Sequence, residues 1–319
     1  MIEVKHLTKR YGSSTQKAVD DLSFTINDGV IYGFLGPNGA GKSTTMNIIT
    51  GCLGATEGSV TIDGHDIFEE PLEAKKRIGY LPELPPLYMD MTPYEYLSFV
   101  AKAKHVPRDR REEEIENACR KTHIVEMAFR QIKNLSKGYK QRVGIAQAII
   151  GSPSVIILDE PTVGLDPGQV IEIRELIREL GKEHTVIFSS HILSEVQAVC
   201  DSVLIIDHGR LVISGTLSDL DEQLSGTSTV SLTVMCDEDA ARSVLSQVPG
   251  VTETGFENRD GELHISIVCG RDADIRQDLF RAFAAADIPI LNMARTEASL
   301  EEMFLEVTRA QDNAQKGEE

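Results

Sequence analysis

The sequence predicts an α/β domain built on a parallel β-sheet, followed by a smaller α+β domain. Between residues 150 and 215, short apolar segments alternate with helical ones, and residues 155–158 are apolar at every position. Such a segment is typical of a parallel strand that is covered on both faces. The chain has 319 residues, enough for one large domain and one small domain.

Charge and cysteine content limit the possible function classes. The chain carries 32 basic and 50 acidic residues, a net charge of −18, so we expect no nucleic-acid partner. The five cysteines are widely spaced, which argues against a zinc site or a disulfide framework and fits a reducing cytoplasm. The longest uncharged apolar run, residues 143–158, is too short to span a membrane, which takes about 20 residues.

The first 68 residues predict an antiparallel sheet and then a strand–turn–helix unit. Residues 2–4 and 22–26 alternate apolar with polar side chains, and Asp63-Gly64 signals a hairpin between apolar segments at 60–62 and 67–68. The apolar run 30–35 ends in a glycine-rich turn, after which a helical pattern begins at about Ser43.

The middle of the chain predicts helices and further buried strands. Residues 93–130 have a mostly helical composition. Buried strands are expected at 185–188 and 203–206. The apolar residues expected on one face of the helix that follows residue 166 are Val170, Ile173, Ile177 and Leu180.

A domain boundary is expected near residues 221–229, where the side chains are small and polar. We therefore assign residues 1–222 to the first domain, with a helical subdomain at about 85–150, and residues 228–309 to an accessory domain. Residues 310–319 are expected to form a frayed tail. The accessory domain is expected to have the βαββαβ order of ferredoxin-like folds, with strands at 229–236, 251–257, 262–269 and 289–295, helices at 238–247 and 273–286, and an added amphipathic helix at 299–308.

The turn after residue 35 fits the phosphate-binding motif G-x4-G-K-[ST]. Glycines let successive backbone N–H groups converge on phosphate oxygens, and the following helix adds its positive end. Lys42 is expected to reach the β- and γ-phosphates of a nucleoside triphosphate, and Ser43 to bind Mg²⁺. A glycine-rich turn without a ligand is the alternative. The expected nucleotide-binding residues are Gly36, Pro37, Asn38, Gly39, Ala40, Gly41, Lys42, Ser43 and Thr44.

Two acids follow the buried strand 155–158 directly. Asp159 and Glu160 would lie at the carboxyl edge of the sheet, where open α/β sheets hold their ligands. We expect Asp159 to hold Mg²⁺, directly or through water, and Glu160 to orient or deprotonate the attacking water, a role worth about 10²–10⁴ in rate. Two solvated acids at a strand end are the alternative.

Over residues 1–220 these segments, with several others in the same order, resemble the ATP-binding cassette (ABC) transporter ATPases. Residues 135–142 (LSKGYKQR) resemble the signature sequence, residues 164–166 the D-loop, His191 the switch histidine, and Tyr11 the aromatic residue that stacks on adenine. The resemblance implies a RecA-like P-loop NTPase core with an N-terminal antiparallel β-subdomain and a helical subdomain.

The resemblance also implies a mechanism. Two copies would sandwich two ATP molecules, with Ser136 and Gly138 of one copy against the ATP held by the other. Glu160 would be the main catalytic carboxylate, and His191 would contact the γ-phosphate and the attacking water. Each supporting residue has a structural alternative: Tyr11 as a sheet-edge aromatic, His191 as a helix residue without chemistry, and Asp166 as a helix cap.

The chain departs from the usual family sequence in two places and matches one subgroup of the family in three segments. The signature has Lys137-Gly138-Tyr139 where Gly-Gly-Gln is usual, and Glu83 stands where the family usually has Gln. A carboxylate at position 83 can coordinate Mg²⁺, and it adds negative charge near the phosphates. Tyr-Leu-Pro-Glu at 80–83, the signature, and Ser-Leu-Glu-Glu-Met-Phe at 299–304 resemble cassettes paired with separately encoded exporter permeases of gliding-motility and copper- or drug-export types.

We therefore predict an ATP-hydrolysing subunit that uses ATP and Mg²⁺, forms a homodimer, and drives an integral-membrane permease from the cytoplasmic side of the cell membrane. The permease would dock on residues 83–96. The alternative is a soluble ABC ATPase acting on a ribosomal or nucleic-acid complex. Family members that act on ribosomes usually carry two cassettes in one chain, and this chain has a single phosphate loop. Members that act on DNA need a long coiled-coil insertion, and only 92 positions, without sustained heptads, separate Ser43 from Leu135. A P-loop kinase would not explain the signature or His191. The accessory domain is expected to support the dimer.

Overall fold

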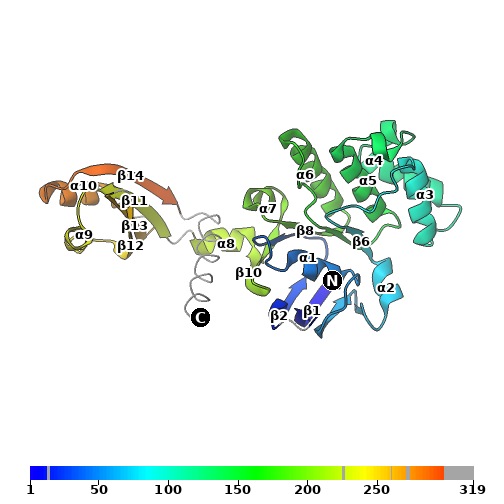
Figure 1. Cartoon of the computed structure of the whole chain (residues 1–319), viewed down its shortest axis with the longest axis horizontal. Coiled ribbons are helices and arrows are strands. Elements are labelled where there is room, and N and C mark those ends of the chain that lie inside the picture. The colour runs from blue at the N-terminus through cyan, green and yellow to red at the C-terminus, as the bar shows by residue number, and fades with distance from the viewer. Residues whose placement is uncertain (13–14, 225–226, 260, 271–273, 298–319) are drawn as a thin grey trace. The chain divides into compact units, whose positions relative to one another are not determined.

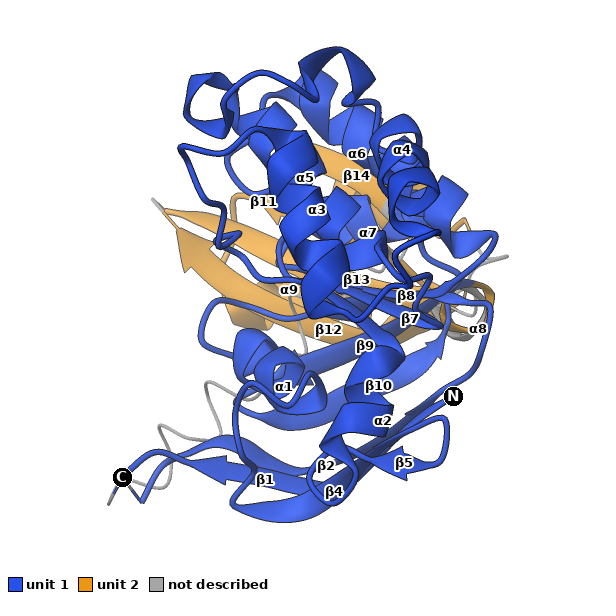
Figure 2. Ribbon diagram, turned by 90° about the vertical axis from the view of Figure 1, so that its right-hand side faces the viewer, with its two compact units in different colours: residues 1–217 blue, residues 218–319 orange. Residues whose placement is uncertain are grey.

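The computed structural model describes residues 1–12, 15–224, 227–259, 261–270 and 274–297. The chain divides into two compact units, residues 1–217 and 218–319 (Figure 2). The division falls at the start of helix α8 (Leu217–Leu224), so the expected domain end at residue 222 lies inside this helix. Among the described residues, no helix combines the length and the apolar character that crossing a membrane requires.

The N-terminal part of unit 1 is an antiparallel sheet, as the alternating pattern predicts. Its strand order is β2-β1-β4-β5. Asp63 and Gly64 adopt φ angles of 49° and 83° and close the expected hairpin as a two-residue turn in which Ile62 faces His65. The paired strand after the turn is residues 65–66, and the N–H of Ile67 still donates a hydrogen bond to the carbonyl of Val60. The strands are β1 (Ile2–Arg10), β2 (Lys17–Ile26), β4 (Glu57–Ile62) and β5 (His65–Asp66).

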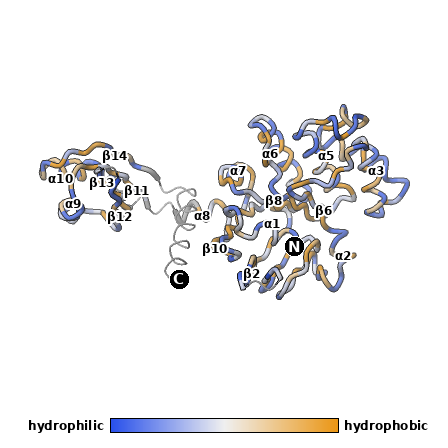
Figure 3. Tube along the Cα trace, in the orientation of Figure 1, coloured by the Kyte–Doolittle hydropathy of each residue, from blue (hydrophilic) through white to orange (hydrophobic). Residues whose placement is uncertain are grey.

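A six-stranded sheet forms the centre of unit 1, in the order β10-β9-β3-β8-β7-β6. Adjacent strands in this sheet are parallel, except that β10 is antiparallel to β9. Every residue of β3, β7, β8 and β9 is buried, which confirms the apolar strands expected from the sequence. Figure 3 shows hydrophobic residues at the position of β8 within unit 1. The strands are β3 (Ile31–Leu35), β6 (Ile78–Leu81), β7 (Val155–Leu158), β8 (Thr185–Ser190), β9 (Ser202–Asp207) and β10 (Arg210–Thr216).

Helices follow the strands of this sheet and also form a group of their own. Figure 1 shows α3, α4 and α5 gathered at one end of unit 1, within the range expected for the helical subdomain. On α6 the buried face is Ile173, Leu176, Ile177 and Leu180, whereas Val170 is only half-buried because it lies in the first turn. The helices are α1 (Lys42–Ile49), α2 (Pro71–Lys76), α3 (Pro93–Ala103), α4 (Arg111–Lys121), α5 (Lys137–Ile149), α6 (Pro167–Gly181) and α7 (Leu193–Val199), with 3₁₀ turns at Val125–Met127 and Ile132–Asn134.

Unit 2 is a four-stranded antiparallel sheet in the order β12-β13-β11-β14, with two helices that pack on one core around Phe283. This is the βαββαβ arrangement that the sequence predicts. The amphipathic helix expected at 299–308 and the tail at 310–319 lie outside the described residues. The elements are β11 (Thr227–Val234), α9 (Glu238–Leu245), β12 (Val251–Arg259), β13 (Glu262–Gly270), α10 (Arg276–Ala285) and β14 (Ile290–Glu297).

Candidate active site

The phosphate-binding motif forms the turn between β3 and α1. Gly41 is the residue before the helix and has φ of 100°, which disfavours any residue with a side chain. A Cβ atom at this position would also lie 2.4 Å from the carbonyl oxygen of Ala18. No side chain caps the first turn of α1, so its N–H groups and its positive end face the turn.

Lys42 is buried beneath this turn, with 6% of its surface exposed. Its Nζ donates hydrogen bonds to the carbonyl oxygens of Gly36 (2.8 Å) and Pro37 (3.2 Å). The same Nζ lies 3.4 Å from Glu160 Oε1. These two carbonyl groups thus hold the Lys42 ammonium next to the turn, where it could contact a phosphate bound by the turn.

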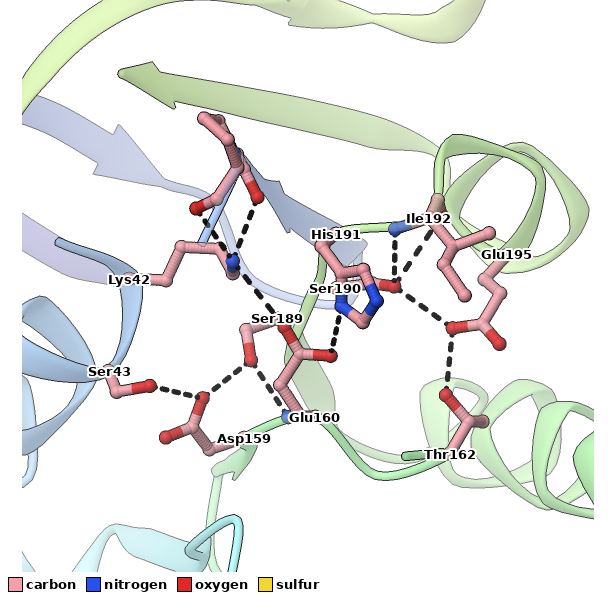
Figure 4. A network of polar contacts seen from close by, with 12 residues as sticks. Lys42, Ser43, Asp159, Glu160, Thr162, Ser189, Ser190, His191, Ile192 and Glu195 are labelled. Atoms are coloured by element: carbon pink, nitrogen blue, oxygen red, sulfur yellow. Dashed lines mark hydrogen bonds and ion pairs between the residues drawn. The ribbon is translucent and has the colours of Figure 1, made fainter. Parts of the chain in front are cut away.

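Asp159 lies between the phosphate-binding turn and strand β8. Its Oδ1 accepts hydrogen bonds from Ser43 Oγ (3.3 Å) and from Ser189 Oγ (2.6 Å). Ser189 Oγ in turn accepts a hydrogen bond of 2.8 Å from the backbone N–H of Glu160 (Figure 4). Ser189 is a site residue that sequence reasoning missed; its only signal is a polar side chain directly after the apolar part of β8.

Glu160 and His191 form the second half of the site. His191 Nδ1 lies 3.0 Å from Glu160 Oε2, and Glu160 is 7% exposed (Figure 4). Glu160 has φ of 47°, a left-handed conformation that costs energy for a residue with a side chain. The strained backbone turns this carboxylate away from Asp159 and toward the histidine.

A cavity of about 490 Å³ connects these residues. It reaches from the turn before α1 to His191, and it includes Glu83, the departure noted in the sequence. Its volume is in the range of small-ligand sites. The lining residues are Ala18, Asn38, Gly39, Gly41, Lys42, Ser43, Thr44, Glu83, Glu160, Val163 and His191.

The donors around this cavity suit a magnesium ion that is shared with a phosphate. Among the described residues, no group of three or more His, Cys, Asp or Glu side chains is arranged to hold a metal by itself. Ser43 and Asp159 are oxygen donors in hydrogen-bond contact, and Glu83 borders the same cavity. Mg²⁺ prefers one or two protein oxygens together with phosphate and water, and these residues fit that demand.

Tyr11 lies beside the turn rather than among the cavity-lining residues. Its ring is half exposed, and its hydroxyl lies 3.2 Å from Thr44 Oγ1. The ammonium of Lys9 lies 5.5 Å from the ring centre, a cation–π distance. An exposed, anchored ring next to the phosphate turn offers a flat surface to a base.

The signature residues stand apart from this cavity within one chain. Ser136 caps α5 and accepts a hydrogen bond of 3.4 Å from the N–H of Tyr139. Gly138 packs against the side chain of Gln169 at the start of α6, and Lys137 Nζ lies over Gly164. Neither Ser136 nor Gly138 lines the cavity described above. Asp166 caps α6, accepting a hydrogen bond of 3.0 Å from the N–H of Gln169.

Comparisons with known proteins agree with this site. A family model described as "ABC transporter" matches residues 19–163. The linearmycin resistance ATP-binding protein LnrL of Bacillus subtilis is 32% identical over 97% of this chain and 98% of its own length. The bacitracin transport ATP-binding protein BcrA of Bacillus licheniformis is 34% identical over 96% of this chain and 97% of its own.

Two solved structures extend the comparison. One is an ATP-binding subunit of an ABC transporter, 32% identical with a TM-score of 0.63, covering 70% of this chain and 92% of that one. The other is a dimeric ATP-binding cassette in a post-hydrolysis state bound to ADP and phosphate. It is 25% identical with a TM-score of 0.62, covering 68% of this chain and 99% of that one.

Proposed function

The chain belongs to the ABC transporter ATP-binding proteins and is an ATP-hydrolysing subunit of this family; from this premise we propose that two copies sandwich two ATP molecules and drive a separate exporter permease. The observation that carries the proposal is that Lys42, Asp159 and the Glu160–His191 pair meet at one edge of the central sheet. Similarity to proteins named for linearmycin resistance and bacitracin transport supports export as the direction.

Binding begins at the turn before α1. The backbone N–H groups of residues 38–43 and of the first turn of the helix would surround the β- and γ-phosphates. Lys42 would add a point charge. Ser43 and Asp159 would hold Mg²⁺, with Glu83 at the border of the same cavity. Bound Mg²⁺ supplies positive charge that offsets the charge developing on the phosphate oxygens.

Hydrolysis requires a water molecule aligned with the γ-phosphate. Glu160 Oε2 is held by His191, and Oε1 faces Lys42. A γ-phosphate carries more negative charge than a carboxylate, so it would compete with Glu160 for the lysine ammonium. The freed oxygen of Glu160 would then accept a hydrogen bond from the attacking water, while His191 contacts the phosphate.

The second copy would close the site. Ser136 is exposed and caps α5, and no acidic residue lies in the first turn of this helix. Gly138 is buried against the Gln169 side chain of the same chain, which would have to move aside for Gly138 to meet the partner's ATP. An anion at that helix end is favoured, so we propose that this face covers the γ-phosphate held by the partner copy. The D-loop and the signature of one chain contact each other through Lys137 and Gly164, so both would move together when the dimer forms.

The permease would dock on the segment that follows Glu83. Leu84 is 83% exposed and Tyr88 is half exposed. The Tyr88 ring lies edge-to-face against Tyr96 and Phe99, at centroid distances of 6.0 and 5.5 Å. Rigid aromatic side chains of this kind suit a protein interface. Because Glu83 borders the nucleotide cavity, the same segment would link the nucleotide to the permease, and the protein would associate peripherally with the cytoplasmic face of the membrane.

Affinity purification tests this proposal. Tagged Glu160→Gln protein is recovered with Mg-ATP from detergent-solubilised membranes, and co-purifying chains are identified by mass spectrometry. We expect a polytopic membrane protein in stoichiometric amount. Leu84→Asp in the same background should lose it, and the matched control Leu72→Asp, an exposed leucine on α2, should keep it. Recovery of only ribosomal or nucleic-acid-bound proteins would contradict the transport role and favour the soluble alternative.

A further inference from the structure

A buried carboxylate on α7 lies behind the hydrolytic pair. Glu195 is 4% exposed, and its Oε2 accepts hydrogen bonds from Thr162 Oγ1 (2.7 Å) and Ser190 Oγ (2.9 Å). Its Oε1 lies 3.7 Å from a guanidinium nitrogen of Arg174 on α6. Burying a carboxylate is costly unless it is paired and hydrogen-bonded, and Glu195 meets both conditions.

The two hydroxyl groups that Glu195 holds flank the hydrolytic pair, one in the loop after β7 and one at the last residue of β8. Thr162 lies two residues after Glu160, and Ser190 directly precedes His191. Ser190 Oγ also accepts a hydrogen bond of 3.0 Å from the N–H of Ile192, which fixes the backbone on the other side of His191. Figure 4 shows one carboxylate tying the loop after β7 to the end of β8.

Glu160 needs such support, because its left-handed backbone persists only where the surroundings hold it. Ser189 fixes its backbone N–H from one side, and Thr162 anchors the next turn of chain through Glu195. The 3.0 Å contact between Glu160 and His191 therefore depends on the relative position of the loop after β7 and the end of β8, which are joined at Glu195.

We propose that Glu195 is a positioning residue for ATP hydrolysis: it holds Glu160 and His191 in register across the ends of β7 and β8. Glu195 is not among the residues that line the nucleotide cavity, so it acts through the pair and not on ATP. Arg174 offsets its charge and ties the same carboxylate to α6, the helix that follows the D-loop. The proposal rests on the assignment of Glu160 and His191 as the hydrolytic pair.

The test separates binding from turnover in full-length protein. In Glu195→Ala we expect kcat to fall at least about 10-fold, since small misplacements of catalytic groups carry losses of this order and more. The Kd for ATP should stay within about 3-fold of wild type, because the phosphate-binding turn is untouched. Glu195→Gln should restore most of kcat, since its amide oxygen can accept both hydroxyl hydrogens. Glu175→Gln, an exposed neighbour of Arg174, serves as the matched carboxylate control.

A double-mutant cycle tests whether Glu195 acts through Glu160. In single-turnover assays, Glu195→Ala should add almost no loss in a Glu160→Gln background, as expected of residues that work as a unit. Additive losses, or an unchanged kcat in folded Glu195→Ala, would overturn the proposal. If Glu195→Ala does not fold, Thr162→Val carries the test: a lower kcat with unchanged Kd is expected, and an unchanged kcat would overturn it.

The outcomes also separate this inference from the proposed hydrolytic pair. If Glu160→Gln alone retains hydrolysis, the assignment of the pair fails and the positioning role falls with it. If Glu160→Gln sharply lowers the single-turnover rate and Glu195→Ala leaves kcat unchanged, only the positioning role is overturned.

Discussion

Lys42 Nζ lies 3.4 Å from Glu160 Oε1, although the two residues follow different strands of the central sheet. Lys42 follows β3 and Glu160 follows β7, and β8 lies between these strands and contributes Ser189 and His191. Because the three strands are parallel, their carboxyl ends meet at one edge. That edge brings the turn before α1, the oxygen atoms that we propose hold Mg²⁺ and the proposed hydrolytic pair within contact distance.

Replacing Lys42 should weaken ATP binding. Hydrogen bonds to charged groups contribute about 1.5–3 kcal/mol, so we expect Lys42→Ala to raise the Kd for ATP by about 10- to 100-fold. Titration with a fluorescent ATP analogue measures this. Lys76→Ala, an exposed lysine paired with Glu73, should bind as wild type. Retention of tight binding in Lys42→Ala would refute the phosphate-loop assignment.

Tyr11 should contribute a stacking surface to the adenine base. Aromatic–base stacking is worth about 1–3 kcal/mol, and the half-exposed ring favours the lower end, so Tyr11→Ala should weaken ATP binding by about 5-fold. Tyr11→Phe keeps the ring and loses only the contact with Thr44, so it should bind almost as wild type. Equal binding by all three proteins would leave Tyr11 as a sheet-edge aromatic.

Two glycines of the phosphate turn should differ in their tolerance of alanine. Both have positive φ angles, 86° at Gly39 and 100° at Gly41, which cost an L-residue about 1–2 kcal/mol. Only at Gly41 would the added Cβ also collide with Ala18, whereas nothing lies within 4 Å of it at Gly39. Urea unfolding should therefore show a larger loss of stability in Gly41→Ala than in Gly39→Ala. Equal losses would contradict the turn geometry.

Lys104 should make the stability of unit 1 depend on pH in the alkaline range. Its Nζ donates hydrogen bonds to the carbonyls of Gln147, Ala148 and Ile150 at the end of α5. Burial lowers the pKa of Lys104 from 10.5 to about 8, although Glu114 opposes the shift. Between these two values the unfolded chain holds a proton that the folded chain has released, so the free energy of unfolding rises with pH.

The variant Lys104→Met isolates this effect. The difference in free energy of unfolding between wild type and variant should shift by about 1–2 kcal/mol in favour of wild type between pH 7.5 and 9.5. Urea unfolding at both pH values gives the measurement. Parallel pH dependence in the two proteins would show that Lys104 titrates at its ordinary pKa.

The sequence predicts most of the fold because the buried strands and the helix faces leave periodic patterns. It misses β6 and β10, the two edges of the central sheet: β6 is only four residues long and contains a glycine, and β10 has no buried face. β10 is half-buried or exposed at every position, so no period stands out. The hairpin predicted at Asp63-Gly64 is confirmed, and its turn sets the register, with Ile62 paired to His65.

The sequence predicts the site residues that stand together in one motif, but not those that meet only because neighbouring strands of the sheet lie side by side. The phosphate turn and the acids after β7 stand together in the sequence. The hydrogen bonds from Ser189 to Asp159 and from Thr162 to Glu195 join positions 30 and 33 residues apart, through the register of β7 and β8. No spacing rule within one segment reports such contacts, which is why these residues are visible only in the fold.

The central claim is that ATP holds two copies together until Glu160 permits hydrolysis. Light scattering of purified Glu160→Gln protein with and without Mg-ATP tests it most directly. We predict a species of twice the 35.1 kDa chain mass with Mg-ATP and a monomer without it, and a monomer in both conditions once Lys42→Ala is added. A monomeric Glu160→Gln protein that binds Mg-ATP would contradict the ATP sandwich.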